Sequence, residues 1–148
     1  MRTKNIFMIS ILLFSSSICA QMQKDEIITI ETSEGSIVVH LDAKRAPITV
    51  SNFINLIESN YFDESIFHRV IENFMIQGGG FDAEMNDLES SKTIPNESGN
   101  GLSNLRGTIA MARTSDPHSA NAQFFINTKD NRSLNPKSGR WGYAVFGS

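Results

Sequence analysis

Cysteine is almost absent from this chain of 148 residues, which contains a single thiol. That residue, Cys19, lies within an N-terminal stretch that has the character of an export signal. Without a second cysteine the chain cannot form an internal disulfide, and removal of the signal also removes any thiolate chemistry. Histidine is scarce as well, and His40, His68 and His118 do not have the spacing of metal ligands. The sequence therefore predicts no metal site and no cofactor.

Positive charge is sparse too, with 13 lysines and arginines against 16 acidic residues. Removal of the first twenty residues takes away Arg2 and Lys4, which leaves 11 basic residues and a net charge of −5. Nucleic-acid-binding domains carry a clustered basic face, and the sequence contains no such cluster. Nucleic acid is therefore not predicted as a partner, and the acidic balance is expected to keep the protein soluble.

The apolar run near the N-terminus, residues 6–14, is too short to span a bilayer permanently. It follows two basic residues and precedes the small residues 15–20, which is the layout of a secretory signal peptide. We predict cleavage after Ala20, one mature domain over residues 21–148 without stable membrane insertion, and a periplasmic or secreted location. An uncleaved anchor helix and acylation of Cys19 are the alternatives.

The chain does contain short β-rich runs with turn residues between them. Residues 27–32 and 36–41 are such runs, and Gly35 in the gap between them favours a tight hairpin. After Pro47 the apolar period becomes helical, which predicts a helix over about residues 48–59 that covers one mouth of a barrel. The apolar face of this helix consists of Val50, Phe53, Ile54 and Ile57.

The remainder of the chain alternates strand-like runs with loops. One run contains Arg69 and ends at the glycines 78–80, which indicate a turn because the other residues of a phosphate loop do not follow. The polar residues 82–103 predict a long surface excursion. Further strands are expected at 107–112, 122–127 and 143–146, with loops at 113–121 and 129–142. This pattern favours a mainly β fold, a small antiparallel barrel.

The most informative stretch runs from Phe67 to Phe81 and places one cation, Arg69, among apolar and aromatic residues. Burial of an arginine stem in such company is unfavourable unless the guanidinium has a partner or a function. A second stretch, residues 110–127, repeats this mixture of an apolar wall and a few polar groups. A surface arginine paired with an acid, and a plain barrel core for the aromatic residues, are the purely structural alternatives.

Together the two stretches resemble the halves of the active site in cyclophilin-type peptidyl-prolyl isomerases, and the resemblance runs from about Ile27 to the end of the chain. It implies an eight-stranded antiparallel barrel and isomerisation of X–Pro bonds in exported proteins. The chain stops at Ser148, before the helix and strand that complete the barrel in family members, so this C-terminal part is expected to be missing. The chain is then either truncated or a degraded variant, and its open barrel exposes a strand edge.

The resemblance also implies roles for individual residues. Rotation about an X–Pro bond breaks no covalent bond, so catalysis needs a group that binds the twisted amide better than the planar one. Arg69 is the candidate catalytic residue, because a fixed guanidinium can donate a hydrogen bond to the prolyl nitrogen only in the twisted state. Gln77 is expected to bind a substrate carbonyl, and Gln123 to support the arginine. The backbone at Ala112 and Arg113 is expected to hold the peptide as an added strand.

The proline ring requires an apolar hollow beside the arginine. The resemblance assigns this hollow to Phe74, Met75, Phe125 and Leu134. Tyr143 stands where many members carry a histidine at the rim, so rim binding is expected to survive with altered preference. Ser133 replaces a tryptophan that contacts cyclosporin in sensitive members, so weak inhibition is expected.

The leading hypothesis is a monomeric, exported prolyl isomerase whose partners are proline-containing peptides or unfolded chains. The alternative is a proline-peptide-binding module or holdase chaperone with little or no turnover, since a loosened barrel could still bind. A third possibility is an unfolded fragment without activity.

Overall fold

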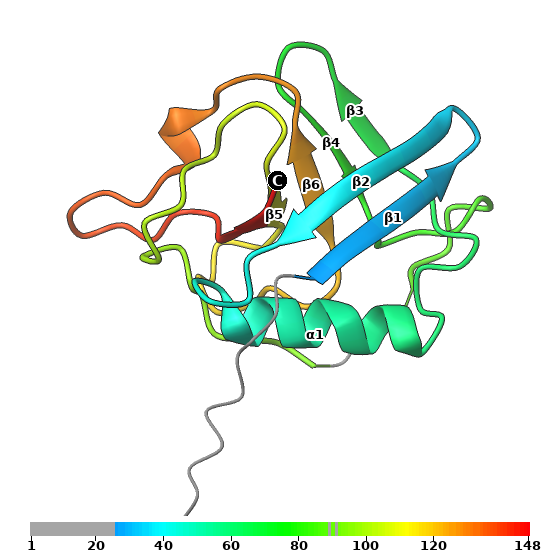
Figure 1. The fold of residues 1–148 in the computed structure, drawn as a ribbon, viewed down its shortest axis with the longest axis horizontal. Coiled ribbons are helices and arrows are strands. Elements are labelled where there is room, and N and C mark those ends of the chain that lie inside the picture. Colours follow the sequence, from blue (N-terminus) through cyan, green and yellow to red (C-terminus); the bar gives the residue numbers. More distant parts are fainter. Residues whose placement is uncertain (1–25, 89, 91) are drawn as a thin grey trace, which may run out of the picture.

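The computed structural model describes residues 26–88, 90 and 92–148, so the signal peptide expected at residues 1–20 lies outside the described residues. Within them the chain forms seven strands, one α-helix and one short 3-10 helix (Figure 1). In chain order these are β1 (Glu26–Thr32), β2 (Gly35–Leu41), α1 (Pro47–Glu58), β3 (Arg69–Ile71), β4 (Met75–Gly78), β5 (Ile109–Met111), β6 (Phe124–Asn127), η1 (Arg132–Leu134) and β7 (Val145–Gly147).

The seven strands form one antiparallel sheet that curls into a half-barrel, in the order β1-β2-β7-β5-β6-β4-β3. Strands β1 and β3 are therefore its edges. Helix α1 runs across one end of the curled sheet (Figure 1), which confirms the predicted mainly β fold with a capping helix. Among the described residues, no helix has the length and apolar character needed to cross a membrane.

The predicted hairpin and helix are both confirmed. Strands β1 and β2 pair along their whole length, and Gly35 closes the hairpin with φ of 122°, a conformation that a side chain would disfavour. Helix α1 has Pro47 in its first turn, where a missing N–H is harmless. Its residues Val50 and Phe53 are buried, as the apolar period predicts, but Ile57 is 36% exposed, so the predicted apolar face is buried only in the first part of the helix.

The run that contains Arg69 differs from the single strand predicted for it. It forms a hairpin of β3 and β4, because the chain reverses at Asn73, which adopts φ of 54° in the left-handed region that asparagine tolerates. Arg69 lies on the edge strand β3 and is exposed, so the expected burial of its stem is wrong. An edge strand has water on one side, and the cation needs no acid to remain solvated.

The two faces of the sheet carry separate apolar clusters. Because side chains alternate along a strand, Ile109 and Met111 of β5 face one cluster and Ala110 faces the other. The larger cluster packs against α1 through Phe53, whose ring lies 5.0 Å from that of Phe146 and 5.4 Å from that of Phe124. The smaller cluster lies on the opposite face and is built from Met75, Ala110, Phe125 and Val145, with partly buried neighbours.

The polar segment 82–103 is more firmly anchored than a surface excursion. Ile94 is buried and pairs with Ala120, donating its N–H to the Ala120 carbonyl at 2.8 Å. Ser98 is also buried, and its Oγ accepts a hydrogen bond from the Gly142 N–H at 3.0 Å. The segment therefore links the helix side of the molecule to the loop that precedes β7.

An apolar hollow of about 1350 Å³ opens between the β1–β2 hairpin and the β3 edge, on the face that α1 covers. Its apolar lining includes Ile28, Ile30, Phe53, Phe67 and Val70. The four charged side chains along it, Glu31, Glu34, Asp63 and Glu64, are all acidic. The half-barrel thus leaves part of its inner face in contact with solvent.

Candidate active site

The smaller apolar cluster brings together most of the residues predicted to hold a proline ring. Met75 and Phe125 are buried in it, on the central strands β4 and β6. Its partly buried members are Phe74, Leu102, Ala112, Leu134 and Tyr143. The cluster therefore joins the two stretches that carry the family resemblance with the loop before β7.

Sheet register places the predicted catalytic cation beside this cluster. Arg69 pairs with Gln77 across β3 and β4, and Gln77 in turn pairs with Phe125 across β4 and β6. Directly opposed residues of neighbouring strands project from the same face of a sheet. The guanidinium, the glutamine amide and the phenyl ring consequently share the face that carries the smaller cluster.

A chain of hydrogen bonds runs along the edge of the cluster. Arg69 Nη1 donates to Gln77 Oε1 at 3.2 Å, and Gln77 Nε2 donates to Gln123 Oε1 at 2.9 Å. Gln123 was expected to support the arginine, and the structure places Gln77 between the two. Gln77 Nε2 carries two hydrogens, so one is left to meet a carbonyl of a bound peptide.

The glycine run at residues 78–80 makes room for this chain of hydrogen bonds. The sequence pattern had predicted only a turn there. A Cβ at Gly80 would lie 2.5 Å from Gln123 Cδ and 2.6 Å from Gln123 Nε2. Real side chains do not approach so closely. The absence of a side chain at Gly80 is thus what allows Gln123 to reach Gln77.

The backbone at Ala112 is less free to hold a peptide than the sequence suggested. Its N–H donates to the Gln123 carbonyl at 2.9 Å, because residue 112 continues the pairing of β5 with β6 beyond the strand end. The side chain of the next residue, Arg113, turns toward Tyr143, with the guanidinium carbon 4.6 Å from the centre of the ring. The structure therefore gives Arg113 a side-chain contact that the sequence did not predict.

A network of asparagines fixes the segment that carries Leu134. Asn131 Nδ2 donates to Asn127 Oδ1 at 2.8 Å and to the Phe74 carbonyl at 2.7 Å. Asn127 Nδ2 donates in turn to Asn104 Oδ1 at 3.2 Å. All three asparagines are buried, so each of these bonds also satisfies a group that water cannot reach.

The histidine beside the catalytic candidate faces the other way. The His68 ring packs against Phe81 at 4.6 Å, and its Nδ1 is buried without a partner among the described residues. Burial lowers the pKa of His68, partly offset by the Ile66 backbone, and the charge of Arg69 lowers it further. Within the described part of the chain, no group of three or more His, Cys, Asp and Glu side chains could hold a metal ion.

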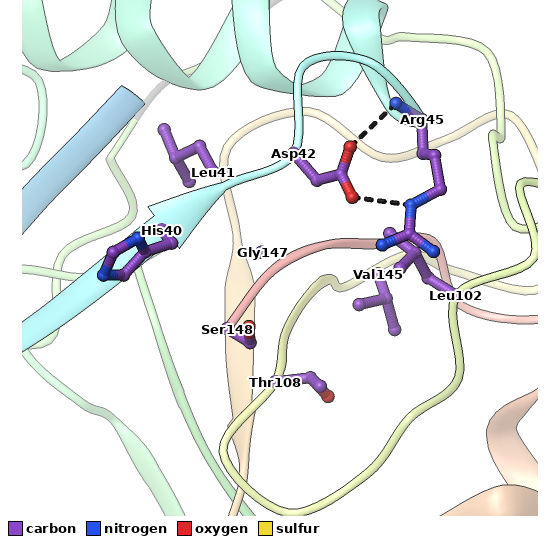
Figure 2. A pocket seen from close by; sticks show the side chains of 9 residues that line it. All are labelled: His40, Leu41, Asp42, Arg45, Leu102, Thr108, Val145, Gly147 and Ser148. Atoms are coloured by element: carbon purple, nitrogen blue, oxygen red, sulfur yellow. Dashed lines mark hydrogen bonds and ion pairs between the residues drawn. The ribbon is translucent and has the colours of Figure 1, made fainter. Parts of the chain in front are cut away.

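A second, smaller hollow of about 200 Å³ lies near β2 and β7 and shares Leu102 and Val145 with the smaller apolar cluster (Figure 2). Its charged residues are bonded to each other: Arg45 donates to Asp42 Oδ1 through its backbone N–H at 2.9 Å and to Oδ2 through Nε at 2.6 Å. Both carboxylate oxygens are thereby engaged at this short turn before α1. The hollow presents an internally satisfied ion pair rather than a reactive group.

Comparison with known proteins agrees with this geometry. Residues 27–148 match the family model described as cyclophilin type peptidyl-prolyl cis-trans isomerase/CLD. The chain is 54% identical over 123 residues to peptidyl-prolyl cis-trans isomerase cyp18 of Streptomyces antibioticus, covering 81% of this chain and 74% of that protein. It is 50% identical over 123 residues to peptidyl-prolyl cis-trans isomerase B of Escherichia coli, covering 80% and 74%.

Solved structures give the same result. A cyclophilin-type isomerase from Cryptosporidium parvum superposes with a TM-score of 0.70 at 26% identity, covering 84% of this chain and 77% of that chain. Its structure in the presence of the dipeptide Ala-Pro superposes with a TM-score of 0.68 at 28% identity, covering 83% and 77%. On its sequence and its fold, this chain belongs to the cyclophilin-type peptidyl-prolyl cis-trans isomerases.

Proposed function

We propose that this chain accelerates cis–trans rotation of X–Pro bonds, with Arg69 as its catalytic residue, in proteins that fold after export. The observation that carries the proposal is the Arg69 guanidinium, held by Gln77 at 3.2 Å on the same sheet face as the apolar cluster around Phe125. Membership of the isomerase family, and relatives that carry the name of this activity, support it.

The chemistry requires electrostatic help and no bond cleavage. Rotation about the amide faces a barrier of about 18–20 kcal/mol. Acceleration by roughly five decades corresponds to lowering that barrier by about 7 kcal/mol. As the amide twists, the prolyl nitrogen loses resonance and gains a lone pair. Arg69 uses one nitrogen on Gln77, which leaves other N–H groups of the fork to donate to that lone pair.

The cluster orients the substrate for this contact. The proline ring packs against Phe125 and Met75, whose apolar surfaces exclude water from the rotating bond. The second Nε2 hydrogen of Gln77 donates to a peptide carbonyl and fixes that side of the bond. The ring and one carbonyl are thus held, and the amide can twist toward the guanidinium. Binding that is stronger in the twisted state than in the planar state is what raises the rate.

The test is the cis-to-trans rate of an Ala-Pro peptide with the purified protein, compared with buffer alone. We expect Arg69→Ala to reduce kcat/KM by about 100-fold or more, because it removes a charge-assisted donor from the transition state. Arg106→Ala, at an exposed arginine outside the cluster, is the matched control and should retain the wild-type rate. An unchanged rate in a folded Arg69→Ala protein would contradict the proposal.

The rival function is a proline-peptide-binding module or holdase. The open hollow between β1 and β3 favours it, because exposed apolar surface can hold unfolded segments. A protein with a cooperative melt and measurable peptide affinity but no rate enhancement would establish the rival. Loss of both a cooperative melt and folded-state circular dichroism would indicate an unfolded fragment.

The site of action rests on the N-terminal sequence pattern. We propose cleavage after Ala20 and a periplasmic or secreted monomer whose partners are proline-containing peptides or unfolded chains, not nucleic acid. The N-terminal residue of the mature protein and its cell fraction test the location, and sedimentation tests the oligomeric state.

A further inference from the structure

A second arginine lies against the smaller apolar cluster around Met75 and Phe125, which we call the prolyl cluster. The guanidinium carbon of Arg113 is 4.6 Å from the centre of the Tyr143 ring. The Tyr143 ring meets Phe125 edge-on, with centroids 5.7 Å apart and an interplanar angle of 78°. Arg113, Tyr143 and Phe125 therefore form a continuous series of contacts from two half-buried side chains to the buried Phe125 of the cluster.

The Arg113 guanidinium is held by its own backbone surroundings rather than by an acid. Its Nε donates to the Gly142 carbonyl at 3.2 Å, its Nη1 to the Thr114 carbonyl at 2.8 Å and its Nη2 to the Trp141 carbonyl at 3.1 Å. All three nitrogens are thus engaged, which fixes the plane of the fork. Two of the three acceptors immediately precede Tyr143 in the chain, so the same side chain also fixes the backbone that presents the ring.

The backbone in front of Tyr143 has further anchors on the opposite side. The Gly142 N–H donates to the buried Ser98 Oγ at 3.0 Å, and the Gly142 carbonyl also accepts from Asn96 Nδ2 at 3.1 Å. Tyr143 itself donates its N–H to the Leu134 carbonyl at 2.9 Å. The backbone is therefore secured from several directions, whereas the position of the Tyr143 ring depends on Phe125 and on the cation.

We propose that Arg113 is a positioning residue that clamps Tyr143 as the rim wall of the prolyl hollow and thereby sets peptide affinity. The inference rests on the proposed isomerase function. A cation over the face of an aromatic ring favours one ring orientation. A ring already held in that orientation loses less freedom when a peptide binds. Because Arg113 is remote from the twisting amide in this scheme, it stabilises planar and twisted substrate equally, and its removal raises KM without lowering kcat.

Five variants test the clamp by steady-state kinetics and by direct titration with an Ala-Pro peptide. We expect Arg113→Gln and Arg113→Lys each to raise KM by roughly five- to tenfold with kcat within about twofold of the wild type, since neither replacement can bridge three carbonyls. Arg106→Gln, at an exposed arginine outside the cluster, is the control and should resemble the wild type. Tyr143→Ala should match Arg113→Gln, and the double variant should be no weaker than Tyr143→Ala alone.

Three results would overturn the clamp: a fall in kcat at unchanged KM, wild-type behaviour of Arg113→Lys, or additive effects in the double variant. If Arg113→Gln does not fold, Arg113→Lys and Tyr143→Ala still decide the question. The double variant is informative because removal of either residue already breaks the single contact between them. Removal of both should therefore weaken binding no further.

A readout without catalysis separates this proposal from the proposed function. Trp141 is the only tryptophan in the chain, is 47% exposed, and receives a hydrogen bond from Arg113 at its carbonyl. In the peptide-free protein, Arg113→Gln should shift the emission of Trp141 and increase its quenching by acrylamide, and the control Arg106→Gln should do neither. Identical spectra for Arg113→Gln and the wild type would refute the clamp. A wild-type protein with no isomerase activity would refute the proposed function alone, because fluorescence and peptide titration would still report on the rim.

Discussion

The absence of a side chain at Gly80 determines where the Gln123 amide can lie. The Gln123 amide occupies the space that a Cβ at Gly80 would need, and from there it holds Gln77. Gln77 in turn holds the Arg69 guanidinium. The position of the catalytic candidate therefore depends on a glycine that touches neither the arginine nor the proposed substrate.

We expect Gly80→Ala to reduce kcat/KM by about tenfold, because the new methyl group displaces Gln123 and breaks its bond with Gln77. The matched control is Gly99→Ala, where a Cβ would have no neighbour within 4 Å. It should leave the rate unchanged. Isomerase kinetics on both variants, with melting temperatures to confirm folding, make the comparison. Equal rates for the two variants would show that Gln123 is dispensable.

His68 makes the stability of the fold depend on pH. Burial lowers its pKa below the ordinary value of 6.5, so the unfolded chain binds a proton more readily than the folded one. The free energy of unfolding should therefore decrease as the pH falls below about 6.5 toward the lowered pKa, and this histidine should contribute no change above that window. Urea titrations at pH 7.5, 6.0 and 5.0 measure the slope.

The His68→Gln variant should lose part of that slope, since glutamine does not titrate. His40→Gln, changed at an exposed position of β2, is the matched control and should keep the slope of the wild type. Parallel curves for His68→Gln and the wild type would contradict the assignment.

Residue types were predicted more successfully than residue contacts. The family resemblance indicated which aromatic residues gather on the sheet face of Arg69. The contact of Arg113 with Tyr143 was missed, since nothing in the local pattern tells whether an arginine side chain turns to solvent or folds back onto carbonyls 28 and 29 positions away. The burial expected for Arg69 was wrong for a related reason: exposure depends on which strand lies at the sheet edge.

At the scale of single elements, helix α1 is specified partly by its own sequence and partly by a residue that is distant in the chain. Its extent follows from Pro47 and the apolar period, and the burial of Val50 and Phe53 was predicted, whereas the predicted burial of Ile57 was wrong. Its N-cap residue, Ala46, has no side-chain acceptor. The acceptor is Glu97, which receives the Ile48 N–H at 3.2 Å, the Thr49 N–H at 2.8 Å and the Thr49 hydroxyl at 2.7 Å. No local pattern could reveal a cap that lies 48 positions away.

Removal of this cap should destabilise the protein measurably. We expect Glu97→Ala to lower the free energy of unfolding by about 2 kcal/mol, because the buried Thr49 loses the partner of its N–H and hydroxyl. Glu97→Gln keeps one acceptor oxygen and should lose less. Urea denaturation measures both.

Glu58→Ala, at the other end of the same helix, provides the control. A negative charge near a helix C-terminus is unfavourable, so this change should leave stability unaltered or raise it by a few tenths of a kcal/mol, about 0.3. Equal losses in the free energy of unfolding from Glu97→Ala and Glu58→Ala would mean that the effect does not depend on which end of helix α1 loses a carboxylate. Glu97 would then not be a cap.

The hairpin of β3 and β4 is the element that the sequence described least well. Its residues form one apolar run, so period alone favoured a single strand. The reversal depends on the φ of 54° at Asn73, and the asparagine was the only local sign of it. The consequence is functional, since only the hairpin places Arg69 opposite Gln77.

On the scale of the whole molecule, the two faces of the half-barrel carry different apolar clusters. The face toward α1 holds the larger cluster and most of the buried aromatic contacts, while the opposite face carries the prolyl cluster and its polar edge. The mainly β class and the single helix could be predicted from turn spacing and period. The sheet order could not, because pairing between β2 and β7 joins segments that lie about a hundred residues apart.

The hollow between β1 and β3 should bind hydrophobic dyes. Val70 lines it and is 68% exposed, so Val70→Lys should reduce the fluorescence of bound anilinonaphthalene sulfonate by about half. Val38 is 58% exposed but does not line the hollow, which makes Val38→Lys the matched control. Both introduce the same charge, so equal dye binding by the two variants would place the dye elsewhere.

The order of strands in the sheet also determines when the protein can fold. Strand β2, formed early in the chain, completes its outer pairing only with the last strand, through bonds such as His40 N–H to the Ser148 carbonyl at 2.8 Å. Helix α1 likewise waits for the carboxylate of Glu97. A nascent chain in which β7 has not yet been synthesised thus has an unpaired edge on β2 and remains extensible. Closure of the sheet beside β2 therefore has to wait until β7 has been synthesised.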